Sequence, residues 1–227
     1  MKNMKSIKSQ QSGFTLVEIA IVLVIIGLLL GGILKGQELI NSAKVKNLAQ
    51  DFKAIPLYIY GYQDRFKALP GDDIRAATNL PTDSAGAPAI VGNGDGALNG
   101  VWSATAPTAE SYMFWQHVRL GNFAPGPTAP GDPTYGPKNV EGGQVGIQSG
   151  TNPPFTGMRG TYIYCSAGIL GKYAKQLDLT LDDGNSATGS LMIGPVGGGV
   201  ANSGSTVPPE VLGTIDDAKT YTVCLAF

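Results

Sequence analysis

Residues 13–34 read GFTLVEIAIVLVIIGLLLGGIL, and this stretch decides how the chain is organised. The 21 residues from Phe14 to Leu34 contain one charged side chain, Glu18. A helix of about 20 apolar residues crosses the roughly 30 Å core of a bilayer. A secretory signal has a shorter apolar run, of about 7–15 residues, and its small-residue cleavage site follows that run. Here the small residue, Gly13, comes first, so cleavage after it leaves the apolar helix on the mature chain.

Glu18 is the residue of this run that needs a partner. A carboxylate within a membrane segment is costly, and it is expected to be paired or functional. Four residues is an awkward spacing for Glu18 to bind the amine that cleavage would create on its own Phe14. We therefore expect the Phe14 amine of a neighbouring copy as its partner, because association neutralises two charges in a medium of low dielectric constant.

The motif GFTLVE at 13–18, followed by an apolar run, resembles the signal of type IV pilins and of the pseudopilins of type II secretion. The resemblance implies cleavage between Gly13 and Phe14 by a prepilin peptidase, N-methylation of Phe14, and a role for Glu18 in assembly. It also implies other copies or related pilins as filament partners, an inner-membrane assembly platform, and the lipid bilayer as surroundings before assembly. The alternative is an uncleaved signal anchor with a chance glutamate.

Charge predicts which side of the membrane each part occupies. Lys2, Lys5 and Lys8 precede the apolar run, which places the N-terminus in the cytoplasm and the bulk of the chain outside. With the resemblance, this predicts a single-pass protein of the bacterial inner membrane with a periplasmic head, which then enters a pilus or pseudopilus. The net charge is −1, and −4 without these three lysines, so no nucleic-acid-binding surface is indicated.

We divide the chain into a leader (1–13), a membrane-spanning and filament-core helix (14–34), an exported amphipathic half of that helix (35–66) and a globular head (67–227). The amphipathic half carries one apolar stripe at alternating spacings of three and four, formed by Val45, Leu48, Phe52, Ile55, Ile59, Tyr62 and Phe66. We expect the stripe to pack into the head, as in pilins; a coiled-coil seam is the alternative.

The head is predicted to be α+β, with a small antiparallel sheet against the N-terminal helix and long Gly- and Pro-rich loops. Strand patterns lie at 161–165, 190–193 and 220–227, and helix patterns at 108–120 and 169–177. Thr108 is predicted to cap the first of these helices and Gly121 to end it. Residues 194–209 are predicted to form a loop.

Cys165 and Cys224 both fall in the exported part, where an oxidising compartment favours a disulfide between them. It would join the last strand to an earlier one. Closing a loop of about 60 residues stabilises the fold by roughly 4 kcal/mol in the chain-entropy model. Two reduced, buried thiols are the alternative.

No catalytic constellation is visible, so an enzyme is not expected. His117 is the one histidine, and no partner stands at the spacing of a catalytic triad or a zinc site. We expect it to be a partly buried helix residue. Trp102, Trp115 and Tyr135 are candidates for an aromatic ligand platform, with core packing favoured for the tryptophans and exposure for Tyr135.

Calcium is the one cofactor that the sequence suggests, because loops rich in Asp and Asn supply the oxygen ligands that this ion prefers. The candidates are Asn93 and Asp95 in one loop and Asp182 and Asp183 in another. The alternative is that both are Asn-Gly or Asp-Gly turns. A rival to the filament subunit follows: a membrane-anchored exported module that binds calcium or carbohydrate and does not polymerise.

Overall fold

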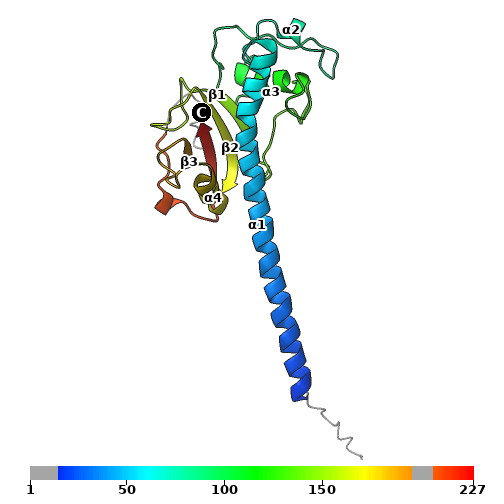
Figure 1. Ribbon diagram of the computed structural model, residues 1–227, viewed down its shortest axis with the longest axis vertical. Coiled ribbons are helices and arrows are strands. Elements are labelled where there is room, and N and C mark those ends of the chain that lie inside the picture. The colour runs from blue at the N-terminus through cyan, green and yellow to red at the C-terminus, as the bar shows by residue number, and fades with distance from the viewer. Residues whose placement is uncertain (1–14, 196–206) are drawn as a thin grey trace, which may run out of the picture. The chain divides into compact units, whose positions relative to one another are not determined.

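The computed structural model describes residues 15–195 and 207–227 (Figure 1). The elements, in chain order, are α1 (Leu16–Phe66), α2 (Ala76–Asn79), α3 (Glu110–Leu120), β1 (Val145–Ser149), β2 (Tyr162–Leu170), α4 (Gly171–Leu181), β3 (Leu191–Pro195), a 3-10 turn (Leu212–Thr214) and β4 (Thr220–Ala226). A long apolar helix and a four-stranded antiparallel sheet make this the α+β, pilin-like arrangement that the sequence predicts. Most of the predicted 194–209 loop lies outside the described residues.

The chain divides into two compact units, and the division falls within helix α1, between Ala43 and Lys44. In the second unit the predicted stripe is buried from Val45 to Tyr62, and Phe66 at its end is partly buried. This half of α1 contributes to the core Val45, Leu48, Ala49, Phe52, Ile55, Ile59 and Tyr62. Phe52, for example, packs edge-on against Tyr164 of β2 with ring centroids 4.9 Å apart. The stripe therefore packs into the head, as predicted, and is not a coiled-coil seam.

The sheet has the strand order β1-β2-β4-β3, and every neighbouring pair is antiparallel. Alternate residues of each strand face opposite sides. Tyr164 and Val223 face the core that contains the α1 stripe. Cys165 and Cys224 face a second cluster, which includes Trp102, Phe155 and Met158. Both faces of the sheet are thus buried, one by α1 and the other by loops.

The start of α4 differs from the prediction. Ile169, predicted to be helical, lies in β2, because β2 continues past an irregularity after Ser166 and pairs Ile169 with Tyr221 of β4. The helix begins only at Gly171. Helix α3 also starts later than predicted: Ala109 is its N-cap, with no side-chain cap bond, so Thr108 does not cap it.

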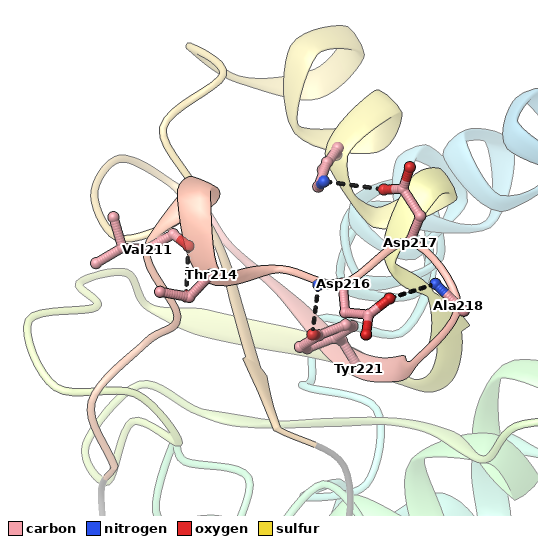
Figure 2. A network of polar contacts seen from close by, with 7 residues as sticks. Val211, Thr214, Asp216, Asp217, Ala218 and Tyr221 are labelled. Carbon is pink, nitrogen blue, oxygen red and sulfur yellow. Dashed lines mark hydrogen bonds and ion pairs between the residues drawn. The ribbon is translucent and has the colours of Figure 1, made fainter.

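The segment before β4 is held to α4 and to its own strand by polar contacts (Figure 2). The Asp217 carboxylate accepts a hydrogen bond from Lys175 Nζ of α4 at 2.9 Å. The Asp216 amide donates to Tyr221 Oη at 2.8 Å, and its carboxylate accepts from the Ala218 amide at 2.9 Å. Asp216 and Asp217 therefore both have hydrogen-bond partners.

Candidate functional site

The first turn of α1 carries a capping box. Thr15 precedes the first helical residue, and Glu18 Oε2 accepts hydrogen bonds from both the backbone amide and Oγ1 of Thr15, each at 2.8 Å. The Glu18 amide in turn donates to Thr15 Oγ1 at 3.2 Å. This reciprocal pairing satisfies donors at the start of the helix that have no partner within it. Our sequence reasoning missed this arrangement, although the pattern Thr-x-x-Glu before an apolar run is its known signature.

The helix that follows presents apolar side chains to its surroundings. It includes an 18-residue window with a mean hydropathy of 2.8, none of which is buried. Leu16, Leu28 and Leu34, for example, are exposed. By length and composition this helix can cross a membrane. Side chains of this kind require another apolar phase, either lipid or the same face of other chains.

The comparisons with known proteins identify this segment. Residues 8–34 match the family described as the prokaryotic N-terminal methylation motif. The chain carries the prepilin-type signature. Neither the curated proteins nor the solved structures gave a match.

The prepilin-type motif and the apolar helix fit a membrane-anchored, pilin-like precursor that is processed and exported. The motif implies processing by a prepilin peptidase and assembly with other pilins, and its family is structural rather than catalytic. Gly13 and Phe14, between which cleavage is predicted, lie outside the described residues.

The disulfide of the pilin-like head is present in the structure. Cys165 of β2 and Cys224 of β4 are bonded and stand opposite each other in the strand register. Both are fully buried in the cluster on the loop-covered side of the sheet. The predicted pairing of the last strand with an earlier one is therefore confirmed.

The loop that contains Asn93 and Asp95 wraps around carboxylates of the head itself. Asp72 accepts hydrogen bonds from the amides of Gly94, Asp95 and Gly96. Glu110 accepts from the amides of Asn93 and Asn99 at 3.0 and 2.9 Å. The Asp95 carboxylate accepts from the side-chain amides of Asn93 and Asn99, and these bonds, with one from a backbone amide, lower its pKa. Oxygens of Asp72, Asp95 and Glu110 lie within 4.8 Å of one another, but protein donors already occupy each carboxylate.

His117 joins α3 to the turn that follows α1. Its Nδ1 accepts a hydrogen bond from the Gly71 amide at 2.8 Å, and its Nε2 lies 2.6 Å from the Ile90 carbonyl oxygen. The ring is therefore the neutral tautomer with the proton on Nε2. The side chain is fully buried, and burial lowers its pKa, against smaller opposing effects of the Ile90 bond and of Asp73 and Asp72. Both ring nitrogens bind backbone groups, so His117 holds the structure together and is more deeply buried than expected.

The three aromatic candidates for a ligand platform are buried. Trp102 and Trp115 are each 6% exposed and Tyr135 is fully buried, so the expected exposure of Tyr135 is wrong. Tyr135 lies beside Arg119, whose guanidinium is 4.9 Å from its ring and donates to the Tyr135 carbonyl oxygen at 2.7 Å. A Pro- and Gly-rich loop indicated exposure, whereas this stacking encloses the ring. Trp102, Trp115 and Tyr135 therefore do not form an exposed aromatic platform for a ligand.

The second acidic cluster lies at the end of α4 and includes Asp178, a residue of that helix that our sequence reasoning missed. Oxygens of Asp178, Asp182 and Asp183 lie within 4.8 Å of one another. Burial, together with the charges of Asp182 and Asp183, raises the pKa of Asp178 to about 6. Asp178 and Asp182 are four residues apart, but Asp182 is the C-cap residue and has no helical conformation, so the fold and not helix spacing brings the two carboxylates together.

Proposed function

We propose that this protein is a structural subunit of a type IV pilus or of a type II secretion pseudopilus. The observation that carries the proposal is the methylation motif at residues 8–34, which continues into a helix of exposed apolar side chains. A lipid bilayer covers such a helix before assembly. In a filament, the same side chains bury one another, and the loss of apolar surface supplies most of the association free energy.

In this proposal Glu18 has two roles that use different atoms. Its Oε2 caps its own helix through Thr15. An ammonium group on Phe14 of a neighbouring copy can approach Oε1 without breaking that cap. The ion pair would set the register between subunits, as complementary charges do at other interfaces, while apolar contact provides the affinity.

Substitutions at Glu18 and Thr15 separate the two roles. Glutamine at the third helical position still completes a capping box. Glu18→Gln therefore keeps the cap and removes the charge, Glu18→Ala removes both, and Thr15→Ala removes the hydroxyl and keeps the charge. We expect both Glu18 variants to be cleaved normally and to yield at least about tenfold fewer filaments, with a smaller loss for Thr15→Ala. Normal filaments from Glu18→Gln would refute the ion pair.

The intact mass of the protein in filaments sheared from native cells tests the function directly. A mass that begins at Phe14 and includes one methyl group, in an abundant band, identifies a major pilin. The same processed mass confined to membranes identifies a pseudopilin or a minor subunit. A mass that still includes residues 1–13 would overturn the proposal in favour of the non-polymerising anchored module. Replacing Gly13 with a bulkier residue is expected to give that unprocessed mass and serves as the control.

A further inference from the structure

The carboxylate of Asp178 is buried without a partner at the C-terminal end of α4. The residue is 0% exposed. Within residues 15–195 and 207–227, neither of its oxygens has a hydrogen-bond partner. A buried carboxylate without donors is costly, and proteins satisfy such groups with hydrogen bonds, a paired charge or a metal ion.

The neighbours of Asp178 among the described residues add negative charge. Asp182 and Asp183 stand beside it, and the C-terminal end of a helix carries a partial negative charge of its own. The last turn of the described α4 contains no basic residue. Lys175, one turn earlier, is bound to Asp217 on the segment before β4. Three carboxylates and a helix C-terminus therefore converge on one point.

The loop after α4 is shaped to hold Asp182 in this position. Asp182 Oδ2 accepts a hydrogen bond from the amide of Leu191, the first residue of β3, at 2.8 Å. Gly189 has a φ of +89°, and a Cβ built on it would lie 2.1 Å from the same oxygen. Asp183 is exposed, and it accepts from the Asn185 amide at 2.8 Å. The three side chains thus come from a helix terminus and a loop that closes back on it.

We propose that Asp178, Asp182 and Asp183 bind a divalent cation, and that Ca²⁺ is the ion that fits. All of the ligands are oxygens on a helix end and a loop, as Ca²⁺ requires, and Ca²⁺–oxygen distances of about 2.4 Å allow two ligands to stand about 4.8 Å apart. The bound ion would join α4 to the start of β3. This inference does not depend on filament assembly, so it stands or falls separately from the proposed function.

The geometry favours this cluster over the acidic cluster of Asp72, Asp95 and Glu110. In that cluster backbone and side-chain N–H groups point at the carboxylates, which is the arrangement that stabilises an anion. Asp178 has no such donors within the described residues. We therefore expect one site and not two.

Calcium binding to the full mature chain in detergent micelles tests the proposal. Equilibrium dialysis with radioactive Ca²⁺ is expected to give one ion per chain, with a dissociation constant of roughly 10⁻⁴–10⁻³ M, as in other extracellular modules. Relative to EDTA, Ca²⁺ at about ten times that value is expected to raise the midpoint of thermal unfolding, followed by tryptophan fluorescence, by about 3–6 °C.

Three variants locate the site. Asp178→Asn is expected to weaken binding at least tenfold and to abolish the shift in midpoint. Asp183→Asn changes an exposed residue and keeps an oxygen that can accept the bond from the Asn185 amide, so it decides the question if Asp178→Asn fails to fold. It is expected to weaken binding at least threefold. Asp95→Asn is the matched control and should bind as the wild type does. A wild-type chain that binds no Ca²⁺, or binding that Asp95→Asn abolishes and Asp183→Asn leaves intact, would overturn the proposal.

Discussion

His117 shows how much one buried side chain fixes at the residue scale. Its two ring nitrogens bind the backbone at Gly71 and Ile90, and its ring stacks on Tyr62 of α1 at a centroid distance of 6.0 Å. Asp72 and Asp73 are the charged groups that act on it. A loop of the head, the turn after α1 and helix α3 thus meet at a ring that must stay neutral.

This ring makes stability depend on pH in a defined direction. The pKa of His117 is lowered in the folded state, so below the unfolded value of about 6.5 the unfolded chain binds a proton that the folded chain does not. The stabilising contribution is complete above that pH and is lost as the pH falls, by at most about 1.4 kcal/mol per pH unit. Urea unfolding of the wild type and of His117→Asn at pH 7.5, 6.5 and 5.5 measures this difference. Other titrating groups contribute equally to both chains. Equal pH dependence in the two chains would contradict a neutral buried His117.

The sequence predicted some residue roles well. The apolar positions of the α1 stripe are visible from their spacing alone, and the lone histidine on a helix was expected to be partly buried. The sequence predicted only some members of each carboxylate cluster. Asn93, Asp95, Asp182 and Asp183 stood out as turn residues, whereas the partners that decide their chemistry, such as Asp178, are set by the fold.

At the scale of the elements, β1 depends on a residue without a side chain. A Cβ built on Gly146 would lie 1.8 Å from the carbonyl oxygen of Trp102, because the backbone of that loop crosses the strand closely. The crossing is fixed by a hydrogen bond from the Trp102 amide to Gln148 Oε1 at 2.9 Å. Any side chain at position 146 must therefore displace the loop or the strand.

We expect Gly146→Ala to lower the free energy of unfolding by about 2–3 kcal/mol through this overpacking. The control is Gly136→Ala, because a Cβ there meets no atom within 4 Å and φ is not positive, so its effect should stay within about 0.5 kcal/mol. Urea unfolding midpoints of the two variants give the comparison. Similar midpoints would show that the loop yields easily.

Element boundaries were predicted correctly where local sequence signals determine them. They were missed where strand pairing with a distant segment determines them. The end of α1 at Phe66, ahead of a Pro-Gly turn, matches the expectation. Ile169 was assigned to a helix because the continuation of β2 past Ser166 depends on β4, which lies more than 50 residues further along the chain. No local pattern contains that information.

At the scale of the whole molecule, short strands separated by turns predicted an antiparallel sheet, and the cysteines predicted its covalent link. The order β1-β2-β4-β3 and the face on which the disulfide lies come from long-range packing and were not predictable from periodicity. The bond joins the two central strands on the face of the sheet that points away from the α1 stripe.

Removing this bond should reduce stability without changing the fold. We expect Cys165→Ala with Cys224→Ala to lower the free energy of unfolding by about 2–5 kcal/mol, because the unfolded chain regains the freedom of a long loop. Urea unfolding under non-reducing conditions measures the loss. Thiols that react in the native exported protein before any unfolding would contradict the bond.

The place of β4 has a consequence for the timing of folding. The two inner strands are β2 and β4, and β4 follows every other strand in the sequence. β4 pairs with both β2 and β3, so these two strands cannot be joined until residues 220–226 have been translated and moved across the membrane. Cys165 cannot pair with Cys224 before that point either. The head is therefore expected to cross the membrane unfolded and to fold in one late step. Once folded, β4 is paired on both edges and bonded to β2 by the disulfide, so the last strand to arrive is among the most difficult to displace from the sheet.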